Sequence, residues 1–362
     1  MNSVSKKRLV LAALIFAFAV AGLNAQIPGN MLGEAINQSG FDYVPENEFN
    51  KVFQEFLATN YPRKNTFSQL EVEGVTTAFA LYVVSNATIS AQWKKYAEAQ
   101  QAAQQASEQA RRLNESGLAY MNKFDFDRAI ADFTEAIRLD PNHATLYSNR
   151  GAAYRYKGDF DRAIADYTEA IRLEPTASRY YSRGNAYSSK NDYDRAIADF
   201  DQAIRLDPRN ASAYYYRGDA YNRKNDYDRA IADFTEAIRL EPTGTRYYSR
   251  GTAYSSKKDY DRAIADYTEA IRLNPNYESA YTARAYIYIG KGDYDRAITD
   301  YTESIRLSPS YSAQFRYRDR ADAYIKKGNY PLARADVNKA LQIDPNYQAA
   351  KDLDAELKQK GY

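Results

Sequence analysis

Apolar and polar positions along most of this chain follow a helical period that restarts at regular intervals. Tyr147, Gly151 and Tyr154 recur with the spacing of one helix face, and a Lys-Gly-Asp turn follows them at 157–159. A second helical face then begins at Ala163. Because residues three and four apart lie on the same side of a helix, this pattern predicts two short amphipathic helices joined by a tight turn.

The second helix of this hairpin carries its own boundary signals. Asp159 precedes it and is predicted to cap its N-terminus, because a carboxylate there accepts hydrogen bonds from free backbone amides. Arg172 lies in its last turn, where a cation suits the helix dipole, and Pro175 ends it.

The hairpin pattern is repeated seven times. Asp-Arg-Ala-Ile-Ala-Asp, or a near copy of it, recurs every 33 or 34 residues, and a weaker seventh copy follows 36 residues after the sixth. The copies begin at Asp127, Asp161, Asp194, Asp228, Asp261, Asp295 and Pro331. A single hairpin cannot bury its apolar stripe, so the units are expected to stack into an array.

This pattern resembles the tetratricopeptide repeat, whose signature places an aromatic residue, Leu-Gly, Tyr, Ala, Phe and Pro at set offsets. In the third unit these places are held by Tyr180, Arg183, Gly184, Tyr187, Ala196, Phe200 and Pro208. The resemblance implies an all-α fold, a right-handed superhelical solenoid of seven helix-turn-helix units over residues 106–347.

Arginine replaces the signature leucine in six units. In one interpretation, the side chains pack along their helices and pair with nearby aspartates. In the other, they form a track that binds anions. The abundance of neighbouring acids favours pairing. The six positions are Arg150, Arg183, Arg217, Arg250, Arg284 and Arg320.

The units are least regular at the C-terminal end and most alike in the centre. Ala285 and Ala321 replace the signature glycine, and Val337 stands where a ring is usual. Residues 348–362 are expected to form a helix that closes the stack, the alternative being a frayed tail. Residues 144–210 and 211–277 align without gaps, which indicates duplication of a two-repeat block.

The region before the repeats divides into two parts. Residues 1–25 join a positive start to an apolar run from Leu9 to Leu23 and small residues, which predicts an export signal, the alternative being an uncleaved anchor. Residues 26–105 show no repeat and are predicted to form a mixed or helical segment. Within them, Pro45–Leu57 indicates a short helix, and Ala91–Leu113 a strong helix that runs into the first repeat.

Composition narrows the chemistry that the chain can perform. It has 35 Tyr, no Cys and one His, His143, so thiolate or multi-histidine metal sites cannot be built. The net charge of +2 does not indicate the basic surface that binding of nucleic acid would need. Asp161, Asp166 and their copies recur in every repeat, which favours a solvated, pairing face over a catalytic pair. We therefore expect no enzyme activity, no metal and no cofactor.

The resemblance implies a binding groove lined by the first helix of each unit. Tyrosine occupies one equivalent groove position in three successive repeats, which suits extended peptides or stacking on sugars. The alternative is that these rings only cover the seam between helices. The groove positions are Tyr181, Asn185, Tyr215, Asp219, Asn222, Arg223, Tyr248, Thr252, Arg155, Tyr156 and Tyr286, with Ser148, Arg318 and Asp322 as further candidates.

The leading functional hypothesis is an exported scaffold, in a bacterial periplasm or at a cell surface, that binds an extended peptide or protein segment in this groove. The second is a binder of cell-wall glycan or glycopeptide on the same rings. The third is an enzyme whose chemistry lies in residues 26–105. Family members that bind the C-terminal tails of chaperones hold the terminal carboxylate with a clamp of Lys, Asn and Arg. The matching places in this chain hold Ser148, Tyr216 and Leu118, so this specialised function is not expected. Contact with a membrane is expected only through an uncleaved signal.

Overall fold

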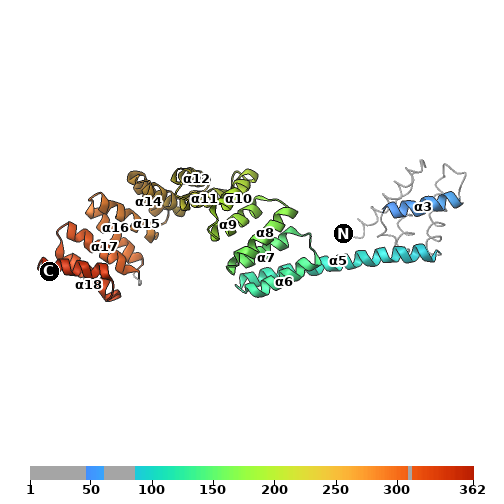
Figure 1. Ribbon diagram of the computed structural model, residues 1–362, viewed down its shortest axis with the longest axis horizontal. Coiled ribbons are helices and arrows are strands. Elements are labelled where there is room, and N and C mark those ends of the chain that lie inside the picture. The colour runs from blue at the N-terminus through green and yellow to red at the C-terminus, as the bar shows by residue number, and fades with distance from the viewer. Residues whose placement is uncertain (1–45, 61–85, 309–311) are drawn as a thin grey trace. The chain divides into compact units, whose positions relative to one another are not determined.

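A computed structural model of the chain describes residues 46–60, 86–308 and 312–362, all of whose regular elements are helices. The helices, shown in order along the chain in Figure 1, are α3 Glu46–Asn60, α5 Ala87–Asn122, α6 Phe126–Leu139, α7 Ala144–Tyr156, α8 Phe160–Leu173, α9 Ala177–Ser189, α10 Tyr193–Leu206, α11 Ala211–Arg223, α12 Tyr227–Leu240, α13 Gly244–Ser256, α14 Tyr260–Leu273, α15 Glu278–Gly290, α16 Tyr294–Leu307, α17 Ala313–Lys326, α18 Tyr330–Ile343 and α19 Gln348–Gln359. The described residues fall into two compact units, one made of those up to residue 116 together with 135–141, and the other of those within 117–134 and 142–362.

The first unit contains α3 and most of α5. The short helix predicted over Pro45–Leu57 is found at Glu46–Asn60, and the strong helix predicted over Ala91–Leu113 continues to Asn122. No helix in the described ranges is both long and apolar enough to cross a membrane. The predicted export signal at residues 1–25 lies outside the described residues, as do residues 26–45 and 61–85 of the predicted mixed or helical segment.

The second unit is built from helix pairs that succeed one another from α7 to α18, each first helix packing on the second helix of its own repeat (Figure 1). The all-α array predicted from the repeats is therefore confirmed. Residues predicted to close the stack form α19, whose Leu357 is fully buried against Val337 and Ala333 of α18.

Capping explains why the second helices begin where they do. The Asp159 side chain accepts a hydrogen bond from the Arg162 backbone N–H, so the predicted N-cap is confirmed. The same geometry recurs at Asp192, Asp226, Asp259, Asp293 and Asn329. Each cap satisfies one of the amides that a helix N-terminus leaves unpaired.

Paired arginines and aspartates hold together the two helices of the second to seventh repeats. Arg183 on α9 donates from Nε and Nη2 to both carboxylate oxygens of Asp199 on α10, at 2.7 Å, and its Nη1 reaches Thr168 of the preceding repeat. Asp199 is only 4% exposed. We call this set of pairs the arginine seam; its members are Arg150–Asp166, Arg183–Asp199, Arg217–Asp233, Arg250–Asp266, Arg284–Asp300 and Arg320–Asp336.

The arginine seam confirms pairing over an anion track, because each guanidinium is already engaged. It also corrects one expectation. Asp166 and the five other aspartates of the arginine seam do not lie on a solvated face: they are buried and pair within their own repeat. Asp161, five residues earlier, does match that expectation, since it is exposed and pairs with Lys190 of the next repeat.

The alternation between 33 and 34 residues also has a structural cause. Three residues join α8 to α9, whereas four join α10 to α11. In the shorter connection, Arg179 is buried and donates to the Glu174 carbonyl at 2.9 Å while pairing with the Glu174 carboxylate. Arg246 and Glu241 repeat this arrangement before α13, whereas α11 has Ala213 at the equivalent place. The arginine therefore closes the shorter turn.

Candidate binding surface on the first helices

The first helices of the central repeats present tyrosines at one equivalent position. The Tyr181 ring on α9 lies 6.1 Å from that of Phe200, Tyr215 on α11 lies 5.6 Å from Phe234, and Tyr248 on α13 lies 5.5 Å from Tyr267. All three rings are half-buried. They therefore cover the seam on one side, as the alternative interpretation expected, and keep part of each ring exposed.

Two tyrosines that were not among the predicted groove positions join these rings into a patch. Tyr216, 39% exposed, lies 5.7 Å from Tyr181 and 5.1 Å from Tyr215. Tyr277, which precedes α15, lies 5.1 Å from Tyr248. The Tyr215 hydroxyl and Ser249 Oγ, 3.2 Å apart, link the two groups. We call Tyr181, Tyr215, Tyr216, Tyr248 and Tyr277 the tyrosine patch.

The phenols of the tyrosine patch are neutral at physiological pH, as ordinary tyrosine side chains are. Partial burial raises the pKa of the Tyr181, Tyr215 and Tyr248 phenols further in the same direction. Neutral phenols offer a flat apolar ring together with a hydroxyl that donates or accepts a hydrogen bond.

The polar groove candidates lie beside the patch. Asn185 is a neighbour of the Tyr181 hydroxyl, and Thr252 Oγ1 donates to the Tyr248 carbonyl at 3.0 Å. Asp219 lies 3.7 Å from Arg223, and burial raises the pKa of the Asp219 carboxyl while Arg223 opposes that shift.

Asn222 is the least satisfied of these groups. Its Oδ1 is buried and has no hydrogen-bond partner among the described residues. A buried acceptor without a partner is costly, so it is a natural place for a donor from a ligand.

The charged side chains of α9, α11 and α13 are all paired, and on α11 they include the exposed Arg223, 3.7 Å from Asp219. In α9 and α13 every charged side chain is an arginine that pairs with a carboxylate: Arg179, Arg183, Arg246 and Arg250. What remains exposed or half-exposed on these helices is serine, threonine, asparagine and tyrosine. Tyrosine together with small polar residues is the composition of binding surfaces that grip with rigid rings and adaptable hydrogen bonds.

The remaining groove candidates are not part of the tyrosine patch. Tyr286 stands 72% exposed on α15. Ser148 accepts from Arg179 Nε at 3.2 Å, Arg318 donates to the Tyr347 hydroxyl at 3.1 Å, and Asp322 pairs with Lys326. The last three side chains are therefore engaged within the protein.

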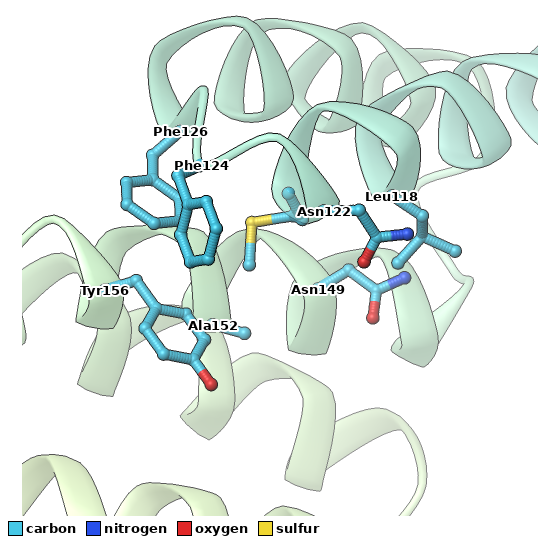
Figure 2. Close-up of a pocket in the computed structure, with 8 residues that line it drawn as sticks. Leu118, Asn122, Phe124, Phe126, Asn149, Ala152 and Tyr156 are labelled. Carbon is cyan, nitrogen blue, oxygen red and sulfur yellow. The ribbon is translucent and has the colours of Figure 1, made fainter.

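Tyr156 lines a separate feature, a hollow of about 440 Å³ beside the end of α5, and Arg155 lies next to it. The Arg155 guanidinium lies 4.5 Å from the centre of the Tyr156 ring. Figure 2 shows the Phe124, Phe126 and Tyr156 rings on one side of the hollow and the Asn122 and Asn149 amides on the other. We call this feature the apolar hollow; its lining is Leu118, Met121, Asn122, Phe124, Phe126, Asn149, Ala152 and Tyr156.

Neither the tyrosine patch nor the apolar hollow holds a cluster of metal-ligating side chains. Among the described residues, no group of three or more His, Asp and Glu side chains could hold a metal ion. The surface can offer ring stacking, hydroxyl and amide hydrogen bonds and an apolar cavity, which are the tools of binding.

Comparison with known proteins agrees with this architecture. Three family models match: one described as tetratricopeptide repeat at residues 181–245 and 282–348, a second of that description at 144–176 and 246–277, and one described as TPR repeat at 117–155. No curated protein matches the chain.

Two solved structures show the same fold. A tetratricopeptide repeat protein from Parabacteroides merdae is 22% identical, with a TM-score of 0.51 over 70% of this chain and 99% of that one. The C-terminal part of a TPR repeat-containing protein from Cytophaga hutchinsonii is 20% identical, with a TM-score of 0.57 over 66% of this chain and 98% of that one. The chain belongs to the tetratricopeptide repeat family.

Proposed function

We propose that this protein is a scaffold that binds an extended peptide or protein segment across the tyrosine patch. The family supports a protein-interaction role. The observation that carries the finer proposal is the patch itself: five tyrosines from four successive repeats, linked ring to ring or through Ser249, on a surface almost free of unpaired charge. A linear array of rings with neighbouring hydroxyls and amides suits a ligand that runs along the helices rather than a compact metabolite.

Export is part of the same proposal. Its support is the positive start, apolar run and small residues of positions 1–25, which are typical of a signal that directs a chain out of the cytoplasm. The partner would then be met in a periplasm or at a cell surface.

The proposal predicts that replacing Tyr181, Tyr215 and Tyr248 together by alanine removes partner binding. Each ring contributes contact area that alanine lacks, so partner recovered after crosslinking in the native organism should fall at least about tenfold. Partner identification by mass spectrometry and quantification against wild type provide the measurement.

A matched control exists in the same three repeats. Tyr193, Tyr227 and Tyr260 begin the second helices α10, α12 and α14, so their triple alanine variant removes the same number of rings from another surface. It should keep the partner. Both variants are checked by circular dichroism, and equal loss in both would reject the tyrosine patch as the site. Sedimentation of the wild-type protein with purified cell wall, lost in the patch variant and with no protein partner recovered, would reject a peptide ligand in favour of a glycan.

A further inference from the structure

The apolar hollow combines three departures from the pattern of the other repeats. Leu118 stands where the equivalent residues are Ala152, Asn185, Asp219, Thr252, Tyr286 and Asp322. Tyr156 stands where they are Asn122, Ser189, Arg223, Ser256, Gly290 and Lys326. The third departure is Phe124. With the residues that most other repeats have at these three positions, the surface here would be smaller and more polar.

Phe124 is the most informative of the three. Its φ is 58°, in the left-handed region that residues other than glycine rarely adopt. Its ring is 80% exposed. The equivalent turn residues are Gly158, Asn191, Asn225, Lys258, Gly292 and Gly328. A strained backbone and an exposed phenyl ring both oppose folding, so stability does not explain this residue.

The rings around the hollow are arranged as an open clamp. Phe126 stacks on Tyr156 with centres 5.7 Å apart and planes at 8°, and Phe124 meets the edge of Phe126 at 6.3 Å (Figure 2). The amides of Asn122 and Asn149 lie across from these rings. A hollow with rings on one side and amides on the other fits an apolar side chain together with the peptide backbone that carries it.

The positive charge of Arg155, beside the apolar hollow, indicates which residue of a ligand would follow the apolar side chain. The Arg155 guanidinium sits over the Tyr156 ring and is an electrostatic neighbour of the Tyr167 and Tyr181 hydroxyls, yet it has no carboxylate partner among the described residues. The equivalent positions in the next three repeats are Ser188, Asn222 and Ser255. Arg155 is therefore a cation placed between the hollow and the tyrosine patch, and it attracts a carboxylate.

We propose that the apolar hollow anchors an extended peptide through one large apolar side chain, and that Arg155 pairs with an acidic residue two positions along that peptide. Residues two apart in an extended chain face the same way at a spacing of roughly 7 Å, which places the acid beside the anchor. The peptide then continues towards Tyr181. This inference rests on the proposed function and adds the chemistry of the ligand, a peptide with one large apolar residue and an acidic residue two positions from it.

The test selects ligands from a phage-displayed library of random 12-residue peptides, with the full chain as bait. We expect enriched sequences to carry a large aliphatic or aromatic residue and, two positions away, Asp or Glu. One enriched peptide, labelled with fluorescein, then serves as the probe for fluorescence polarisation.

The variants copy residues from other repeats, so they preserve the fold. Phe124→Gly restores the residue type of Gly158 and should weaken the peptide at least tenfold while leaving the melting temperature equal or higher. Arg155→Ser copies Ser188 and should weaken the same peptide and reduce its dependence on salt. Lys258→Gly, at the equivalent turn of the fifth repeat, is the matched control and should leave affinity unchanged.

Several outcomes would overturn the inference. They are enrichment of sequences without the apolar–acid pair, an affinity unaffected by Phe124→Gly, no enrichment over a blank surface, or wild-type self-association that Phe124→Gly abolishes. The two proposals fail separately: if the natural partner is lost with the tyrosine patch variant but kept with Phe124→Gly, the scaffold stands and the anchor does not.

Discussion

Replacing Arg183 by leucine, the residue that the family signature has at that place, is expected to lower the free energy of unfolding by about 3–5 kcal/mol. The reason is the partner left behind. Asp199 is 4% exposed and receives both of its strong hydrogen bonds from Arg183. Without the guanidinium, a buried carboxylate loses its counter-charge and must either stay charged in a poor solvent or take up a proton. Equilibrium urea unfolding followed by circular dichroism measures the loss.

Two further variants separate this explanation from a simple loss of packing. Adding Asp199→Ala to Arg183→Leu removes the stranded carboxylate and should recover most of the stability, because an apolar pair can replace a buried ion pair at little net cost. Lys190→Ala breaks the exposed pair with Asp161 and should cost less than about 1 kcal/mol. If Arg183→Leu costs no more than Lys190→Ala, the arginine seam does not hold the helix pairs together.

Replacing Gly184 by alanine is expected to destabilise the third repeat by about 1–3 kcal/mol. A Cβ at this position would lie 2.8 Å from Cε1 of the fully buried Phe200 ring, so α9 and α10 must move apart. Repeat six admits Ala285 beside Tyr301, which shows that a shift of the helices can make room. In the centre of the array such a shift also disturbs the neighbours on both sides. Chemical denaturation of the purified variant measures the cost.

The seventh repeat supplies the compensating change. There Ala321 is paired with Val337 instead of a ring, and both are fully buried. Phe200→Val should therefore relieve the clash, and the double variant Gly184→Ala/Phe200→Val should lose about 0.5–3 kcal/mol less than the sum of the two single losses. Strict additivity would mean that the glycine is not required by the ring.

Much of the fold follows from the sequence because the repeated features are local. The caps, the terminating prolines and the small residues opposite rings lie within one hairpin, and each recurs in register. The pairing of Arg183 with Asp199 could be anticipated because both occur once per unit on adjacent helices. The burial of Asp166 could not, because charged side chains five residues apart on one helix can face in different directions, and only packing decides which one is covered.

The candidate site was predicted less completely. Tyr181, Tyr215 and Tyr248 could be found because they are equivalent positions. Tyr216 adjoins one of them but points about 100° away on an ideal helix, so its contact with Tyr181 depends on the stacking of repeats. Tyr277 and Phe124 lie in connections between helices, where helical periodicity carries no information. Phe124 could have been noticed by comparing turn residues across the repeats.

The central claim is that the exposed side of the first helices is where a partner lies. The most direct measurement incorporates a photo-crosslinking amino acid at one position at a time in the native organism: at Tyr216 and Tyr286 on first helices, and at Ala165 and Ala232 on the exposed side of second helices. The account predicts adducts of one partner from Tyr216, with few or none from the two alanine positions. Adducts from Ala165 and Ala232, with none from Tyr216, would contradict it.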